Sequence, residues 1–266
     1  MNAREVADHW EANAEVWTLC SRAGYDVYRD ALNTPAFLAM LPPITRLEGL
    51  DVGCGEGSNT RKLAERGARI WAVDVAPTFI RYADEAETAE PRGIHYQVGD
   101  AMALPFPDGR FDFVTAFMSL MDVPDPALAL REAQRVLRPG GFLQFSILHP
   151  CFVPPYRKVL REESGKVRAI EIAGYFEPEE GRIDTWWFGA MPREGRGRIP
   201  PFRIPRFHRT LSAWVEIICA AGLVIQEFRE PSASPEIAKK VPAVADTRVA
   251  GIFLHIRAGK PAAPGP

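Results

Sequence analysis

Short apolar runs alternate with helical stretches over the middle of the chain, and this alternation limits the possible folds more than any other feature of the sequence. The runs have the length and composition of buried strands. They lie at 47–52, 69–73, 94–98, 111–117 and 142–148. Apolar residues recur at helical spacing in the stretches 58–66, 78–87 and 126–137. The pattern predicts an α/β protein with a mostly parallel sheet and helices on both faces.

Further elements are predicted on either side of this region. Two helices are expected at 4–16 and 25–32, and one at 211–221. The last two strands, at 223–228 and 251–256, have no clear helix between them, so we expect an antiparallel pair at one edge of the sheet. The sequence Pro139-Gly140-Gly141 is predicted to end the helix that precedes it.

The composition is that of an ordinary globular protein with one domain. The 266 residues carry 32 basic and 34 acidic side chains, for a net charge of −2. A chain this close to neutral lacks the basic excess of a general nucleic-acid binder, and no apolar run approaches the roughly 18 residues that a membrane span requires. The polar N-terminal residues lack the apolar core of a signal peptide, so we expect a cytoplasmic protein. The cysteines form no C-x-x-C pair, which argues against zinc and disulfides. They are Cys20, Cys54, Cys151 and Cys219.

A glycine-rich turn joins the first predicted strand to its helix, in the sequence Leu50-Asp51-Val52-Gly53-Cys54-Gly55-Glu56-Gly57-Ser58. Its glycines let the backbone lie against a ligand. Asp74 ends the next strand, where a carboxylate can accept hydrogen bonds from ribose hydroxyls, and Asp100 follows the third strand. Because the carboxyl ends of parallel strands share one sheet edge, these groups predict a site for a nucleotide-like ligand.

Two classes of nucleotide ligand compete for this turn. A dinucleotide site uses the pattern G-x-G-x-x-G, whereas here Gly53, Gly55 and Gly57 alternate and Ser58 follows. Glu56 lies inside the turn, where its charge would repel a pyrophosphate. A ligand with positive charge suits the turn better.

These residues resemble the class I S-adenosylmethionine-dependent methyltransferases, in particular the UbiE/COQ5-like small-molecule branch (methyltransferase type 11). The resemblance covers most of the chain. Besides the glycine turn, it lies at 73–77, 99–106, 111–114 and 135–141. It implies a Rossmann-like, seven-stranded sheet with one antiparallel strand, and S-adenosylmethionine as the cofactor, which leaves as S-adenosylhomocysteine.

The resemblance also implies which residues bind the cofactor. Gly53 and Gly55 are expected at its methionine portion, Asp74 at its ribose, and Asp100 with Ala101 at its adenine. The full predicted set is Tyr28, Arg29, Asp51, Gly53, Cys54, Gly55, Asp74, Val75, Asp100, Ala101, Met102 and Phe117.

Residues 28–35 resemble the helical cap of this branch. There Arg29 is expected to pair with the cofactor carboxylate, and Tyr28 to hydrogen-bond to the cofactor or stack on it. The chain departs from the family pattern at Ala76, where a serine is common, and at Met121-Asp122, where a histidine often stands. The second departure removes a familiar candidate for a catalytic base.

We divide the chain as one methyltransferase domain with distinct parts. They are a helical cap (1–44), a cofactor-binding core (45–149), an inserted substrate lid (150–206), the remainder of the core (207–258) and a disordered tail (259–266).

The inserted lid segregates its charges along the sequence. Its first half is mainly acidic, with Glu162, Glu163, Glu171, Glu177, Glu179, Glu180 and Asp184. Its second half is mainly basic, with Arg193, Arg196, Arg198, Arg203 and Arg206. We expect antiparallel strands around Tyr175-Phe176 and 185–188 whose charges pair across the two halves. Trp186, Trp187 and Phe188 either line a pocket for a flat, apolar acceptor or pack the lid onto the sheet.

Two histidines are candidate catalytic bases. His149 follows the fifth strand at the cofactor edge of the sheet, and His208 lies just before the helix at 211–221. Each is alternatively a buried histidine that bonds to backbone. No cluster of histidine and carboxylate residues has metal-ligand spacing, so no metal is expected.

Three functions remain open. The first is transfer of a methyl group by in-line displacement to an O, N or C atom of a small-molecule metabolite, natural-product or quinone-like. The second is a nucleic-acid methyltransferase, suggested by the arginines between 193 and 209, although 117–120 lacks the Asn/Asp-Pro-Pro-Tyr sequence of exocyclic-amine methylases. The third is a cofactor-binding protein without catalysis. We expect a small-molecule methyl acceptor, no nucleic-acid or membrane partner, and a monomer or homodimer.

Overall fold

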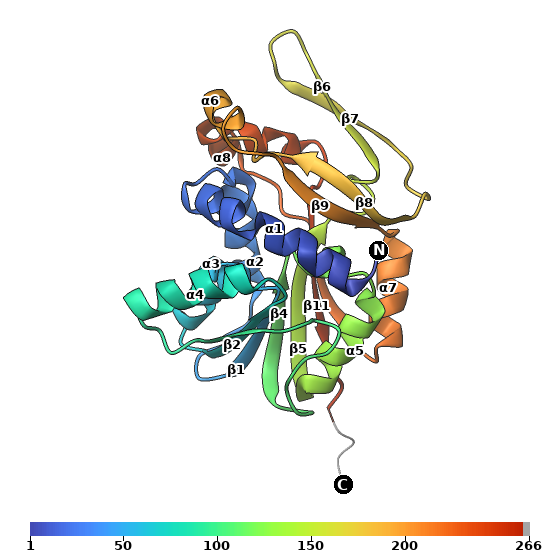
Figure 1. Ribbon diagram of the computed structural model, residues 1–266. Helices are drawn as coiled ribbons and strands as arrows, with labels where there is room; N and C mark the ends of the chain where they lie inside the picture. The colour runs from blue at the N-terminus through green and yellow to red at the C-terminus, as the bar shows by residue number, and fades with distance from the viewer. Residues whose placement is uncertain (263–266) are drawn as a thin grey trace.

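A seven-stranded sheet forms the centre of the computed structural model, which describes residues 1–262 (Figure 1). The strand order is β10-β11-β5-β4-β1-β2-β3, and β11 runs antiparallel to both of its neighbours. These strands are β1 (Glu48–Val52), β2 (Arg69–Asp74), β3 (His95–Val98), β4 (Phe111–Phe117), β5 (Leu137–Leu148), β10 (Val224–Arg229) and β11 (Phe253–Gly259). The Rossmann-like sheet with one antiparallel strand is thus confirmed, as is the antiparallel pair at its edge.

Helices cover both faces of the sheet. The α-helices are α1 (Ala3–Arg22), α2 (Thr34–Met40), α3 (Ser58–Ala64), α4 (Pro77–Ala89), α5 (Pro126–Val136), α6 (Arg193–Arg196), α7 (Leu211–Ala220) and α8 (Pro235–Lys240). Helices α5 and α7 bury Leu130 and Trp214 in the larger core cluster, against one face. On the other face, α3 contributes Leu63 to a second cluster with Ile70 of β2 and Phe113 of β4. No helix within 1–262 is long and apolar enough to cross a bilayer.

The glycines predicted to end α5 lie instead inside β5. Leu137 already pairs with Phe111 of β4, and the register shifts between Phe111 and Phe113. Gly140 has φ +83°, and a Cβ on Gly141 would lie 2.7 Å from the carbonyl oxygen of Asp112. The glycines therefore permit a close approach of β5 to its neighbour, and α5 has already ended at Val136.

Three further expectations need correction. The helix predicted at 25–32 is a π-helical turn, η1 (Arg29–Asn33), that continues into α2. The connection between β10 and β11, expected to lack a helix, contains α8 and a 3-10 helix, η3 (Pro242–Arg248). The tail was expected to be disordered from residue 259, but Gly259 pairs with Phe142 in the sheet and the Lys260 ammonium donates to two backbone carbonyls of the core. The part of this expectation that falls on 263–266 lies outside the described residues.

The lid folds as two separate antiparallel pairs. They are β6 (Tyr156–Arg161) with β7 (Val167–Ala173), and β8 (Glu179–Trp186) with β9 (Phe202–His208). The β6–β7 hairpin projects from the molecule at the top of Figure 1. Tyr175 and Phe176, expected in a strand, lie in the turn between β7 and β8, and the Phe176 side chain is 85% exposed.

Opposite charges join the two halves of the lid, as their segregation predicted. The Arg206 guanidinium on β9 forms ion pairs with Glu179 and Asp184 on β8, both at 3.1 Å. The β8–β9 pair also rests on α1, where the Asn13 side chain exchanges two hydrogen bonds with the backbone of Arg203. The lid is therefore fastened to the N-terminal helix.

Candidate active site

The glycine turn between β1 and α3 is held against the end of β2. The backbone N–H groups of Gly53 and Cys54 both donate to the carbonyl of Val73, at 2.8 and 3.0 Å. Gly53 has φ +70°, and a Cβ there would lie 2.3 Å from Cβ of Ser119. Only glycine therefore fits at this position, where the turn meets the segment after β4.

Asp51 fixes the elements on either side of this turn. Its buried carboxylate accepts hydrogen bonds from the hydroxyls of Thr60 on α3 at 2.6 Å and Thr115 on β4 at 2.8 Å. Burial raises the pKa of Asp51, and the two hydroxyls act in the opposite direction. Both oxygens already bond to protein groups, so the role of Asp51 is to hold α3 and β4 in place beside the turn.

Asp74 ends β2 beside the same turn. Its carboxylate accepts from the N–H of Gly55 at 2.8 Å and from the N–H of Ala76 at 3.0 Å. Each oxygen keeps a second lone pair for a ligand. Burial raises the pKa of Asp74 to about 6, although the backbone N–H groups oppose that change.

Asp100 closes a tight turn after β3. Its side chain accepts from the N–H of Met102 at 2.8 Å, and its carbonyl accepts from the N–H of Ala103 at 3.0 Å. This turn brings Ala101 and Met102 to the same edge of the sheet as Asp74. The carboxyl ends of β1, β2 and β3 thus converge as predicted.

One cavity of about 670 Å³ lies between this edge and the lid. All twelve predicted cofactor residues line it, from Tyr28 to Phe117. The lid supplies Trp186, Trp187 and Phe188 to the opposite wall. A volume of this size is in the range of small-ligand sites, and a single space serves both the glycine turn and the lid.

The sequence and the fold match known proteins. Residues 50–145 match a family model described as a methyltransferase domain. A ubiquinone biosynthesis O-methyltransferase from Coxiella burnetii is 35% identical over 163 residues, which cover 51% of this chain and 70% of that protein. The chain belongs to the class I S-adenosylmethionine-dependent methyltransferases.

Other relatives of this methyltransferase match over shorter stretches. A malonyl-[acyl-carrier protein] O-methyltransferase from Pseudescherichia vulneris is 32% identical over 120 residues, so this chain spans 46% of the length of that protein. Among solved structures, an S-adenosylmethionine-dependent methyltransferase from Mesorhizobium loti superposes with a TM-score of 0.69 at 25% identity. That match covers 85% of this chain and 96% of the other.

The cavity of the methyltransferase has groups that fit S-adenosylmethionine. Apart from its two chain neighbours, no atom of residues 1–262 lies within 4 Å of a Cβ placed on Gly55, so the turn presents an open backbone surface. The carboxylates of Asp74 and Asp100 keep acceptor capacity for hydroxyl and amino groups. Glu56 also lines the cavity, and its carboxylate is paired with Arg22 at 3.1 Å and with Arg29 at 3.8 Å.

The cap contributes Tyr28 and Arg29 to the lining, but both side chains also have protein partners. The Tyr28 hydroxyl donates toward the carbonyl of Ala243 and the carboxylate of Asp246 in η3, at 2.6 and 2.9 Å. The Arg29 guanidinium bonds to Ser21 and Asp30. The structure thus brings these residues to the cavity, while their contacts with the cofactor stay a prediction.

The two histidines predicted as bases are not among the residues that line the cavity. The N–H of Cys151 donates to Nδ1 of His149, which leaves Nε2 to donate to the Glu230 carboxylate at 2.7 Å. Nε2 of His208 donates to the carbonyl of Tyr175 at 2.8 Å. Both rings are buried and bonded, as the alternative interpretation describes. A catalytic role for either histidine stays a prediction that no contact with the cavity supports.

The lid aromatics line the cavity and also pack the lid, but against α1 and not against the sheet. Trp17 of α1 lies at the centre of their cluster, with ring centroids 5.5 Å from Trp186, 4.8 Å from Phe188 and 4.9 Å from Phe202. Trp186 and Phe188 also line the cavity. These rings therefore pack the lid onto α1, rather than onto the sheet, while their remaining surface faces the ligand space.

Asp122 and Asp246 are among the lining or supporting residues that sequence reasoning missed. Asp122, noted only as a replacement for a histidine, lines the cavity after β4. Asp246 of η3 is buried and joins Tyr28 of the cap to Arg157 of the lid, the latter at 3.0 Å. No periodicity or motif marks Asp246, because its partners come from distant parts of the chain.

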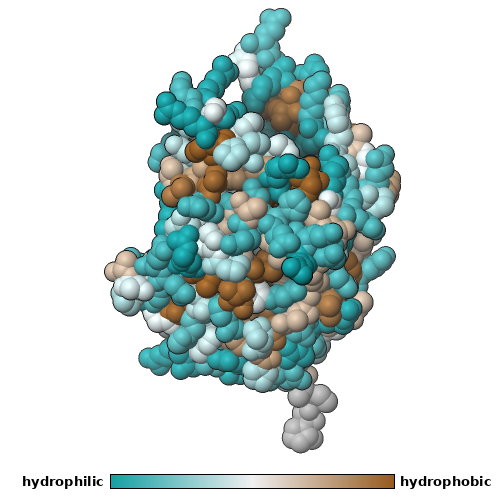
Figure 2. All heavy atoms as spheres, viewed as in Figure 1, coloured by the Kyte–Doolittle hydropathy of each residue, from teal (hydrophilic) through white to brown (hydrophobic). Residues whose placement is uncertain are grey.

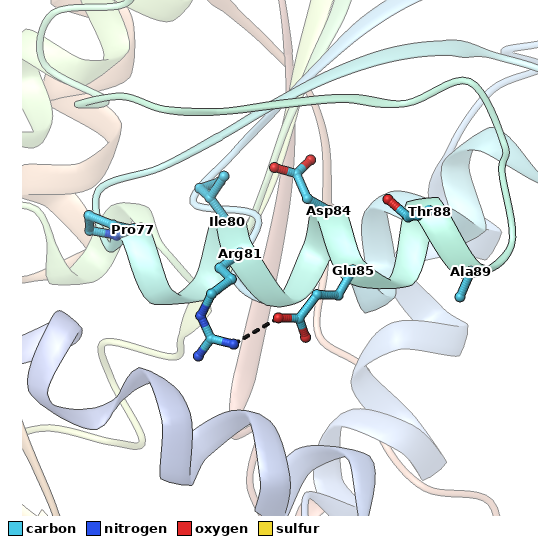
Figure 3. Close-up of a pocket in the computed structure, with 7 residues that line it drawn as sticks. All are labelled: Pro77, Ile80, Arg81, Asp84, Glu85, Thr88 and Ala89. Carbon is cyan, nitrogen blue, oxygen red and sulfur yellow. Dashed lines mark hydrogen bonds and ion pairs between the residues drawn. The ribbon is translucent and has the colours of Figure 1, made fainter.

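A second hollow lies along α4, where Arg81 and Glu85 form an ion pair at 2.8 Å across one turn of the helix (Figure 3). Its lining comes from this one helix and includes none of the predicted site residues. The face in Figure 2 is mostly hydrophilic, with separate apolar patches.

Proposed function

We propose that the protein transfers a methyl group from S-adenosylmethionine to a small-molecule acceptor held under the lid. The observation that carries this proposal is the single cavity shared by the glycine turn and the lid aromatics. The cofactor supplies a methyl group on a positively charged sulfur. The protein's contribution is to fix the acceptor beside it, since orientation alone can supply about 7–11 kcal/mol toward such a barrier.

The predicted cofactor residues divide this work. Gly53 and Gly55 present backbone to the methionine portion, Asp74 accepts hydrogen bonds from the ribose hydroxyls, and Asp100 with Ala101 holds the adenine. The positions of Asp74 and Asp100 at neighbouring strand ends support this assignment. The lid and cap exclude water from the acceptor end.

The acceptor that we propose is a flat, ring-containing metabolite, quinone-like or of natural-product type. The apolar part of the cavity lining supports this class, because Trp186, Phe188 and Phe253 contribute uncharged aromatic rings. Relatives named for demethylmenaquinone and for 2-methyl-6-phytyl-1,4-hydroquinone are 37% and 39% identical over about 100 residues. The acceptor atom that receives the methyl group can be O, N or C.

Part of the arginine cluster that suggested a nucleic-acid substrate is already bonded within the protein. Arg206 is paired with lid carboxylates, and Arg196 and Arg209 donate to the backbone carbonyls of Gly189 and Pro124. Arginine side chains that neutralise phosphates must be free to contact those phosphates. Three arginines of the cluster that suggested RNA are thus engaged within the protein.

The proposal is tested by binding and turnover together. Calorimetry should show S-adenosylhomocysteine binding to the wild type, and a strong loss of affinity in Asp74→Ala. The control is Asp84→Ala, an exposed carboxyl on α4 outside the cavity. Release of S-adenosylhomocysteine is then measured across hydroquinones, catechols, aromatic amines and RNA. Binding without turnover of any acceptor would favour the non-catalytic alternative, and turnover with RNA alone would refute a small-molecule acceptor.

A further inference from the structure

Asp122 has a carboxyl group that faces the cavity without a partner. It ends η2 (Leu120–Asp122), is half-buried and lines the cavity. Among residues 1–262 no donor lies within hydrogen-bonding distance of its carboxyl oxygens. The other carboxyl groups of the lining all have partners. They are Asp26, Asp51, Glu56, Asp74, Asp100 and Asp184.

The position of η2 places the Asp122 carboxyl between the glycine turn and the lid. Just before η2, the Ser119 hydroxyl donates to the carbonyl of Val52 at 2.7 Å, and Ser119 lies against Gly53. This anchors one end of the segment on the glycine turn. On the other side, η2 packs against β9 of the lid. Asp122 is therefore fixed where the expected methionine end of the cofactor meets the acceptor space.

No group within residues 1–262 donates a hydrogen bond to the Asp122 carboxyl. Arg206, whose charge acts on Asp122, directs its Nε and Nη1 to Glu179 and Asp184, and its Nη2 to the carbonyls of Val153 and Pro154. Burial raises the pKa of Asp122 well above its usual range, and Arg206 opposes this only in part. A carboxyl that faces a ligand space with its acceptor capacity free can take a hydrogen bond from a bound molecule.

We propose that Asp122 is a specificity-determining residue that accepts a hydrogen bond from a hydroxyl group of the methyl acceptor. This inference rests on the proposed function, because it assumes that the space under the lid holds the acceptor. A hydroxyl satisfies the carboxyl in either protonation state, since at least one oxygen always accepts. Apolar side chains of the same lining, among them Met121, Trp186 and Phe188, are suited to the apolar body of the same molecule. The acceptor class is thus a hydroxylated aromatic ring.

Binding of matched probes tests this inference without turnover. The protein saturated with S-adenosylhomocysteine is titrated with 2-naphthol and with 2-methylnaphthalene, in which a methyl group replaces the hydroxyl, and fluorescence gives both dissociation constants. The wild type should prefer 2-naphthol about threefold or more, as one hydrogen bond to the carboxyl implies in either protonation state. Asp122→Leu should abolish this preference, and Asp122→Asn, which keeps an acceptor oxygen, should retain part of it.

Two controls separate the possible failures. Asp108→Leu, a highly exposed carboxyl outside the cavity, should leave the preference unchanged. Affinity for S-adenosylhomocysteine should be the same in all variants, and if Asp122→Leu does not fold, Asp122→Asn must still lower the preference. Equal affinity for the two probes in the wild type, including no binding of either, overturns the inference, as does a preference that survives in both variants. If the wild type fails to bind S-adenosylhomocysteine, the proposed function itself is refuted.

Discussion

Replacing Asp74 by asparagine should separate the stability of the free protein from its affinity for the cofactor. In the folded protein, burial raises the pKa of this carboxyl to about 6, from an ordinary value of 3.8. The difference corresponds to about 3 kcal/mol. Because the pKa in the folded state is the higher one, Asp74's favourable contribution to stability is fully present below pH 3.8 and is lost as the pH rises through 6. At pH 8 the ionised carboxylate therefore destabilises the free protein by about 3 kcal/mol relative to its protonated form.

Asn removes that charge but also removes one acceptor. In the wild type the two oxygens accept from the N–H groups of Gly55 and Ala76. In Asp74→Asn the amide nitrogen must face one of these N–H groups, which costs about 1–3 kcal/mol. The two effects oppose each other at pH 8, so the stability of the free variant should lie within about 2 kcal/mol of the wild type. Affinity for S-adenosylhomocysteine should nevertheless fall about tenfold or more, since one ribose hydroxyl loses a charged acceptor.

Urea unfolding at pH 4, 6 and 8, combined with calorimetric titration of S-adenosylhomocysteine, measures both quantities. The wild type should lose about 3 kcal/mol relative to Asp74→Asn between pH 4 and pH 8. Its affinity for the ligand should decline below about pH 6, as the carboxylate becomes protonated. Asp84→Asn on α4 serves as the exposed control. A variant that binds the ligand as tightly as the wild type, or a stability difference that does not change with pH, would refute the reasoning.

Two further substitutions test how the site is built. Gly53→Ala should destabilise the protein by more than about 2 kcal/mol, because positive φ strains alanine and its Cβ overlaps Ser119. Urea unfolding should show that the double variant Gly53→Ala/Ser119→Gly recovers part of this loss. A single variant as stable as the wild type would contradict the geometry. Trp17→Ala should loosen the lid, since its indole contacts three lid rings. Limited proteolysis should then cut within 150–206 faster than in the wild type, whereas the exposed Leu19→Ala on the same helix should not change the rate; equal rates in all three proteins would mean that the cluster does not hold the lid.

The sheet and the cofactor edge were predictable because their signals are local. A strand, a glycine turn and a helix are contiguous in sequence, and Asp51, Asp74 and Asp100 stand at fixed places relative to strand ends. The parallel order then brings these ends together without further information. The π-helical turn at Arg29 and the bulge beside Gly141 follow from tertiary packing, which periodicity does not report.

The acceptor side was harder to predict because its contacts are long-range. His149 looked available at a strand end, yet its ring is bonded to Glu230, which is 81 residues away in sequence. Asp122 looked like the loss of a base, and only the cavity shows that it faces the ligand space. The charge pattern of the lid did predict the pairing of Arg206 with Glu179, because complementary charges on neighbouring strands are a short-range rule.

The walls of the cavity come from different stretches of the chain. The residues expected to contact the methionine, ribose and adenine lie mostly within 51–102, whereas the lid wall lies within 153–206. The two stretches are separated in sequence by β4, α5 and β5, so an exchange of lids between related proteins would leave the cofactor turn intact. On the proposed function, such an exchange should change the methyl acceptor and leave the methyl donor the same.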